Sequence, residues 1–119
     1  MTKEYLGAGH FQEVAFVFNN LNGDGYAENP FANKPDSFKD LSKTMNTAWI
    51  NFFVHQDPNG PNGLPLRSGS NWPVYNATVG GGVGQEILFA EDGASVQMDS
   101  WRAEGLNWLI EHGLSVFGG

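Results

Sequence analysis

The stretch YLGAGHFQEVAFVFNN, residues 5–20, decides how the rest of the chain is interpreted. It places His10 on a glycine-rich turn directly before an apolar run. Residues 3–8 have the length of the end of a strand, which Gly7 and Gly9 break. A strand that enters a glycine turn with a polar side chain at its tip is how an α/β sheet presents a reactive group at its carboxyl edge. The stretch therefore predicts an α/β fold in which His10 points outward.

The remaining chain predicts helices and loops with few strands. Phe38, Leu41 and Met45 begin an apolar pattern with spacings of three and four, which is typical of an amphipathic helix. The predicted elements are a short helix over 11–18, a loop over 19–34, a long helix over 37–55 with Asp36 as its N-cap, a strand-like segment over 72–77, a hairpin of 85–90 and 96–98 around the turn 91–93, and a last helix that begins at Asp99 or Ser100 and ends at Gly113.

Composition excludes several classes of partner and site. Thirteen acidic and six basic residues give a formal charge of −7, and no cluster of Lys or Arg is present to neutralise phosphates, which argues against nucleic acid and anionic membranes. The chain has no cysteine, so disulfides and thiolate metal sites are excluded. No apolar run approaches the roughly 18 residues of a membrane span, and residues 1–6 lack the apolar core of a signal peptide.

The predicted elements lack a common surface on which to pack. Three helices and one hairpin offer several apolar faces, but a lone two-stranded ribbon is marginally stable. Sixteen glycines and six prolines enlarge the conformational entropy that folding must offset. We expect residues 1–119 to form one segment whose helices cover a larger sheet encoded upstream.

Five blocks, in the same order and at similar spacing, resemble the carboxyl-terminal part of type-B carboxylesterases, the family of cholinesterases and secreted fungal lipases. The amino-acid sequences of the first and last blocks are more similar to those of the fungal secreted members. The blocks are residues 7–20, Ala48–Phe52, Asp57–Asn59, Trp72–Tyr75 and Trp101–Gly105.

The resemblance implies the C-terminal part of an α/β-hydrolase fold and a triad of Ser, Glu or Asp, and His, in which the histidine is His10. An imidazole in that role takes the serine proton during attack on a carboxylic ester and returns it to the leaving alcohol. The family match makes Glu13 a carboxylate that supports the histidine turn rather than the triad acid. The resemblance further implies a small-molecule ester as substrate, no metal or organic cofactor, and an extracellular location.

Two departures from the family pattern are visible. Phe11 occupies the position after the histidine, where the family usually has glycine, and it has the bulk to crowd an acyl or alcohol pocket or to shift the loop. No serine stands in a Gly-x-Ser-x-Gly elbow. The resemblance implies that the nucleophile, the triad acid and the oxyanion glycines lie upstream of this segment, and the isolated chain is expected to be inactive.

Other residues receive structural interpretations. His55 and His112 fall at predicted helix ends, where a partial positive charge suits the carbonyl terminus. The segment 20–31 begins like a calcium loop but has Phe31 at its twelfth position in place of glutamate. No group of residues has the spacing of a metal site. The remaining predictions are a surface loop at Gly80–Gly84, a core position for Trp49, Trp101 and Trp108, and a glycosylation acceptor at Asn76 in the triplet Asn76-Ala77-Thr78.

Two classes of function remain open from the sequence. One is the tail of a serine carboxylic-ester hydrolase that supplies the general base. The other is a non-catalytic binding or scaffold module, descended from an esterase tail, that acts through exposed aromatic side chains. Without the resemblance, a lone histidine in a loop is more often a solvated or structural residue.

Overall fold

The computed structural model describes residues 8–67, 69 and 71–118. Within these residues the chain is a mixture of helices with one antiparallel hairpin, which is compatible with part of an α/β fold. The strand predicted at 3–8 lies outside the described residues except for Ala8, which is in a bend. The elements are α2 (Val14–Val17), α3 (Asp36–His55), a 3₁₀ turn η1 (Val79–Gly81), β1 (Gln85–Ala90), β2 (Gly93–Met98) and α4 (Ala103–Phe117).

The long helix α3 confirms the predicted amphipathic segment. Its apolar stripe buries Leu41, Met45 and Ala48. The helix ends at Gln56, whose left-handed φ of 57° lets its N–H donate to the Phe52 carbonyl at 2.8 Å. The predicted N-cap is wrong, because Pro35 occupies that position. Asp36 is instead the first helical residue, where its carboxylate suits the helix dipole and pairs with Lys39 one turn later.

The predicted hairpin is also confirmed, and it packs against α3. Strands β1 and β2 pair in antiparallel register from Gln85 opposite Met98 to Ala90 opposite Gly93. Ala94 of β2 is buried with Ala48 of α3. The segment before the hairpin completes this core, which consists of Ala48, Leu64, Leu66 and Ala94, with Trp72, Ile87, Phe89 and Val96 packed around it.

The strand-like segment predicted at 72–77 is wrong, because a side chain replaces a strand partner. Asn59 is buried, and its amide Nδ2 donates to the Trp72 carbonyl at 3.0 Å. The Trp72 N–H in turn donates to Asn59 Oδ1 at 2.7 Å. Both backbone groups of Trp72 are thereby satisfied without a neighbouring strand, so residues 71–76 remain irregular.

The two remaining helices differ from the prediction at their ends. The helix predicted over 11–18 is reduced to α2, because Phe11 has a φ of 73°, which a right-handed helix excludes. Helix α4 begins at Ala103, after Arg102 adopts a left-handed φ of 57° and covers the Trp101 ring. Gly113 does not end α4, because a glycine within a helix costs only about 1 kcal/mol relative to alanine.

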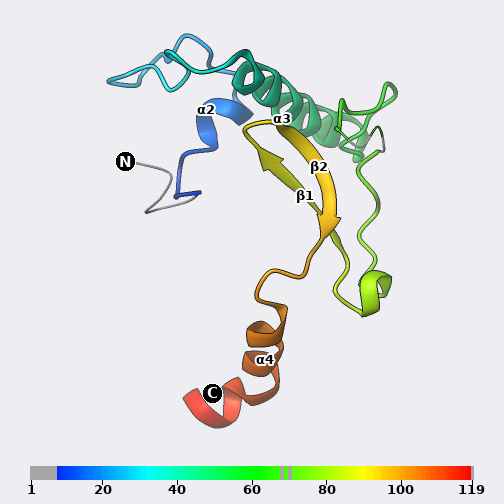
Figure 1. Cartoon of the computed structure of the whole chain (residues 1–119). Coiled ribbons are helices and arrows are strands. Elements are labelled where there is room, and N and C mark those ends of the chain that lie inside the picture. Colours follow the sequence, from blue (N-terminus) through cyan, green and yellow to red (C-terminus); the bar gives the residue numbers. More distant parts are fainter. Residues whose placement is uncertain (1–7, 68, 70, 119) are drawn as a thin grey trace.

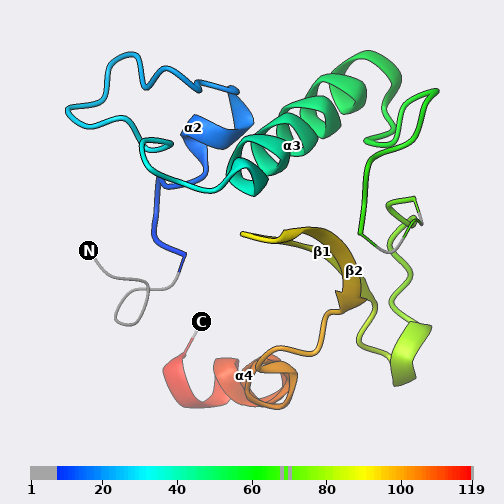
Figure 2. The same cartoon turned by 45° about the horizontal axis from the view of Figure 1, so that its top comes forward.

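The predicted core position of three tryptophans is wrong. Trp49, Trp101 and Trp108 are 47%, 71% and 48% exposed. Helix α4 lies apart from α3 and the hairpin, as two views agree (Figures 1 and 2), and none of its described residues is buried. Its apolar side chains therefore face solvent.

The overall dimensions show that the chain is open. The radius of gyration is 17.2 Å, whereas about 13.5 Å is typical of a compact domain of this length. The accessible surface is 8968 Å², against roughly 6300 Å² for a compact protein of this mass. Within the described residues, large apolar side chains of α3 and α4, such as Phe53 and Ile110, thus stay exposed without the covering layer that a closed domain has.

We predict that the chain associates in solution through these faces. Gel filtration with light scattering should give species larger than 13.0 kDa. The double substitution Ile110→Glu and Leu114→Glu, at positions 79% and 80% exposed, should shift the distribution toward the monomer. Glu111→Gln on the same helix serves as the control. A wild-type monomer with a sharp, cooperative thermal transition would contradict the prediction.

Candidate functional site

The histidine lies on a tight turn that is fastened by two hydrogen bonds. The Gln12 N–H donates to the Gly9 carbonyl at 3.3 Å, and the Gly9 N–H donates to Gln12 Oε1 at 3.0 Å. His10 and Phe11 are the two central residues of this turn, and both are exposed. The imidazole and phenyl rings are tilted by 58° with centroids 6.0 Å apart. The turn therefore presents His10 to solvent, with the Phe11 ring beside it.

The backbone conformation of Phe11 explains why glycine is usual at this position in the carboxylesterase pattern. Phe11 is the third residue of the turn and has a φ of 73°. At this position a type II turn favours glycine or asparagine. A side chain with a Cβ costs roughly 1–2 kcal/mol in the left-handed region. Glycine would fit the turn without this cost. The Phe11 side chain is therefore present at a position where it raises the conformational free energy of the turn.

The described contacts of Glu13 are made by its backbone. Its carbonyl accepts hydrogen bonds from the N–H groups of Phe16 and Val17, both at 2.9 Å, and it forms the N-cap of α2. Its side chain makes no capping hydrogen bond and is exposed. Within the described residues no hydrogen bond joins it to His10. A supporting role for the Glu13 carboxylate stays a prediction.

Helix α3 holds α2 in place through side chains that reach its last carbonyls. Ser42 is fully buried, and its hydroxyl donates to the Phe16 carbonyl at 3.0 Å. The Asn46 amide donates to the Val17 carbonyl at 2.8 Å. These bonds satisfy acceptors that a four-residue helix leaves without internal partners. The histidine turn is thus attached, through α2, to the longest helix of the chain.

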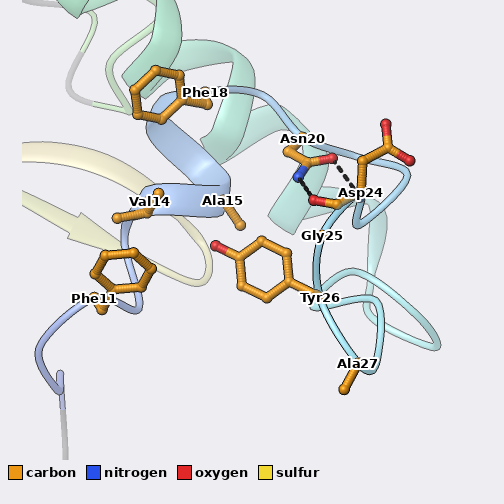
Figure 3. Close-up of a pocket in the computed structure, with 9 residues that line it drawn as sticks. All are labelled: Phe11, Val14, Ala15, Phe18, Asn20, Asp24, Gly25, Tyr26 and Ala27. Atoms are coloured by element: carbon orange, nitrogen blue, oxygen red, sulfur yellow. Dashed lines mark hydrogen bonds between the residues drawn. The ribbon is translucent and has the colours of Figure 1, made fainter.

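A pocket of about 500 Å³ opens between the histidine turn, α2 and the loop that follows it. Phe11, Val14 and Phe18 line it on one side, and Tyr26 reaches into it from the loop (Figure 3). The Tyr26 hydroxyl points toward the side where Val14 and Phe11 lie (Figure 3). The pocket is therefore mainly apolar, with a hydroxyl group on its wall.

The loop wall of the pocket is closed by Asn20 and Asp24. Asn20 Nδ2 donates to the Asp24 carbonyl at 2.9 Å, and the Asp24 N–H donates to Asn20 Oδ1 at 3.0 Å (Figure 3). The Asn20 side chain is engaged with the loop backbone, whereas a calcium loop would direct its first side chain toward the ion. Phe31, at the twelfth position, is buried against the Phe16 ring.

A second hollow, of about 660 Å³, lies beside the carboxyl end of α3. Trp49, Phe52, Trp72 and Phe89 contribute aromatic surface to it. It is far in sequence from His10, and the sequence did not predict it.

The other candidate residues are placed as follows. His55 is in the last turn of α3, whereas His112 lies within α4, where its Nδ1 is 3.0 Å from the Trp108 carbonyl. Asn76 is in an exposed turn, and its Oδ1 accepts hydrogen bonds from the Thr78 N–H at 3.0 Å and the Thr78 hydroxyl at 2.8 Å. The predicted loop at 80–84 includes the end of η1.

The described residues contain neither a metal cluster nor a membrane-spanning helix. No three of their His, Asp and Glu side chains lie close enough together to hold a metal ion. No helix among them has the length and apolar character needed to cross a membrane.

Comparison with known proteins gives one informative similarity. No family model matches the chain. Para-nitrobenzyl esterase of Bacillus subtilis (strain 168) is 38% identical to it over 95 residues, which are 80% of this chain. The chain is thus similar to part of an esterase. It spans only 17% of that protein's length.

The similarity supports the carboxylesterase resemblance and a relation to esterases that act on ester substrates. Because the relative is bacterial, the resemblance to the fungal secreted type receives no support from it. The triad role of His10 stays a prediction.

Sequence reasoning missed the pocket and the part of Tyr26 in it. The prediction of a loop over 19–34 is confirmed. Its turns at Asn22-Gly23 and Asp24-Gly25, however, do not indicate that the chain folds back toward α2. The position of Tyr26, an aromatic residue directly after two glycine turns, was the sequence signal that could have indicated the pocket.

We predict that Ser42→Ala loosens the attachment of α2. It removes the hydroxyl that bonds both the Phe16 carbonyl and Asn19 Oδ1, and the Phe16 carbonyl then keeps only the Asn19 N–H at 3.0 Å, a loss of about 1–2 kcal/mol. Amide hydrogen exchange over residues 14–20 should become about 5- to 30-fold faster. Ser115→Ala is the matched control, because its hydroxyl bonds a carbonyl on the exposed helix α4. Equal exchange in both variants would show that Ser42 does not hold α2.

Proposed function

We propose that the chain is the carboxyl-terminal segment of a serine carboxylesterase and that His10 is the general base of the triad. The similarity to para-nitrobenzyl esterase over 80% of the chain carries this proposal. The exposed histidine turn agrees with it, because a general base must be accessible to the nucleophile and to the substrate.

The reaction is hydrolysis of a carboxylic ester through an acyl-serine intermediate. The serine oxygen bonds to the acyl carbon while the His10 imidazole accepts the hydroxyl proton. The bond from the acyl carbon to the alcohol oxygen then breaks, and the imidazolium gives the proton to the departing alcohol. A water molecule, deprotonated by the same imidazole, then bonds to the acyl carbon. The bond from that carbon to the serine oxygen breaks, and the imidazolium returns the proton to the serine as the acid leaves.

The serine, the triad acid and the oxyanion donors belong to a preceding esterase segment. The missing Gly-x-Ser-x-Gly elbow supports this for the serine, and the family resemblance supports it for the acid and the oxyanion donors. The exposed faces of α3 and α4 are the surfaces that such a segment would cover. Leu106, Leu109 and Leu114 of α4 are 45–80% exposed, so burying them against a sheet would contribute favourable free energy.

A binding module is the second candidate, because the hollow formed by Trp49, Phe52 and Trp72 offers an aromatic surface. The two candidates differ in whether the chain can complete an esterase, which the following experiment decides.

We predict that the isolated chain cleaves esters no faster than free histidine. Fused behind the preceding part of para-nitrobenzyl esterase, in place of the matching segment, it should restore hydrolysis of short-chain aryl esters. His10→Ala in the fusion should lower kcat by about 10³-fold or more, because the serine loses its proton acceptor.

His55→Ala is the control and should leave kcat nearly unchanged, since His55 lies at the far end of α3. Circular dichroism of both variants should match the parent fusion. A folded fusion that works equally well without the His10 imidazole would refute the assignment, and turnover by the chain alone would reveal a separate catalytic site.

We also propose that Asn76 is a glycosylation acceptor, as an exported parent protein would use it. The exposed turn of Asn76 and Thr78 is accessible to modification. Expression of the fusion through a eukaryotic secretory pathway should give a glycan that an endoglycosidase removes, and Thr78→Ala should abolish it. A secreted, folded product without a glycan would rule out Asn76 as an acceptor.

A further inference from the structure

We infer that the Asn62-Gly63 pair is a site of spontaneous deamidation, and that its modification loosens the small core that joins the hairpin to α3. Asn-Gly pairs occur at residues 22–23, 59–60 and 62–63. In the described structure, the last pair differs from the other two because both of its reacting groups are without a hydrogen-bond partner. The modification needs water alone and is independent of the proposed esterase role.

Deamidation of an Asn-Gly pair is an attack by the main chain on the asparagine side chain. The Gly63 nitrogen, after losing its proton to hydroxide, bonds to Asn62 Cγ. The Cγ–Nδ2 bond breaks, and the amide nitrogen takes a proton from water and leaves as ammonia. Glycine favours this step, because no Cβ hinders the approach of its nitrogen.

The resulting succinimide ring opens by addition of water in one of two ways. Cleavage between the ring nitrogen and Cγ gives aspartate in an unchanged main chain. Cleavage between the ring nitrogen and the main-chain carbonyl carbon gives isoaspartate, in which the chain runs through the side-chain carbons. Both products carry a new carboxylate, and isoaspartate also lengthens the main chain by one carbon atom.

The structure protects the first of two identical tripeptides. Pro-Asn-Gly occurs at residues 58–60 and again at 61–63. Asn59 is buried, and its side chain bonds to both backbone groups of Trp72, at 3.0 Å from Nδ2 and 2.7 Å from Oδ1. The Gly60 N–H donates to a carbonyl at 3.2 Å. The nitrogen and the amide that must meet are both engaged, so these bonds must open before the ring can form.

The second tripeptide is free of these restraints. Asn62 is exposed, and within the described part of the chain neither its side chain nor the Gly63 N–H makes a hydrogen bond. Gly63 has a φ of 73°, and a Cβ there would lie 3.1 Å from Asn71 Oδ1. The fold therefore favours glycine at the position that makes Asn62 reactive.

The pair Asn22-Gly23 is intermediate between these two. Asn22 is exposed, but the Gly23 N–H donates to the Asn20 carbonyl at 3.1 Å. Gly23 is also buried, and a Cβ there would lie 2.7 Å from Asn29 Cα, so the turn is closely packed. This turn must open before the Gly23 nitrogen can attack.

Modification at Asn62 acts on the segment that enters the core. The loop lies beyond the carboxyl end of α3, as Figure 1 and Figure 2 both show. Leu64, two residues after Asn62, is buried in the core between α3 and β2. The Arg67 N–H donates to the Ala94 carbonyl of β2 at 2.8 Å. Because protein cores are closely packed, an extra main-chain carbon beside Leu64 displaces the segment 64–67 from its contacts.

The test follows each asparagine in the 119-residue chain during storage in mildly alkaline buffer. Digestion and tandem mass spectrometry give the deamidated fraction at each site. Asn62 should deamidate about 10- to 100-fold faster than Asn59, because Asn59 must first lose several hydrogen bonds. In concentrated urea the two rates should converge, since the tripeptides are identical. Equal rates in the folded chain, or a difference that persists in urea, would overturn the inference.

The effect on the core is measured by amide hydrogen exchange before and after storage. Exchange over residues 64–67 should become about 5- to 30-fold faster in the aged wild type. Asn62→Gln, whose longer side chain forms the ring poorly, should age without this change, whereas the control Asn22→Gln should age like the wild type. Unchanged exchange in chains deamidated at Asn62, or faster exchange in aged Asn62→Gln, would contradict the effect on the core.

Discussion

Packing on α3 is the constraint on which the rest of the described structure depends. Toward its amino-terminal half, Ser42 and Asn46 donate to the last carbonyls of α2. Toward its carboxyl-terminal half, Ala48 lies in a small core with Leu64 and Ala94. In the described part of the chain both α2 and the hairpin pack on α3, so this helix relates the histidine turn to the hairpin in space. Its small buried residues, serine and alanine, allow this close approach, because larger side chains would separate the elements.

The same helix explains why the chain resembles part of a larger domain and not a closed one. One face of α3 is occupied by α2 and the hairpin, but Trp49, Ile50 and Phe53 remain exposed. Helix α4 carries many apolar side chains, and none of its residues is buried in the described structure. A compact protein buries such surfaces, since apolar burial is the main favourable term in folding. The short match to a much longer esterase agrees with this picture.

Rigidity and exposure are combined at the histidine turn. Hydrogen bonds between Gly9 and Gln12 close the turn, and the helix that follows it is anchored to α3. The backbone of His10 is therefore held in place while its ring remains accessible. A catalytic side chain needs both properties, because it must meet its partners in a fixed geometry. The Phe11 ring shares this support, and its left-handed backbone follows from the turn.

The sequence by itself determined the elements whose causes are local. The three-and-four spacing of apolar residues predicted α3, and the Glu91-Asp92-Gly93 turn between apolar runs predicted the hairpin. It also singled out His10, together with its family resemblance. Only the tertiary structure decided features made by distant residues. Asn59 replaces a strand beside Trp72, Ser42 fixes α2, and Tyr26 returns to face Phe11. These contacts join residues 13 to 26 positions apart, or depend on the path of a loop, and no periodicity or turn signal carries that information.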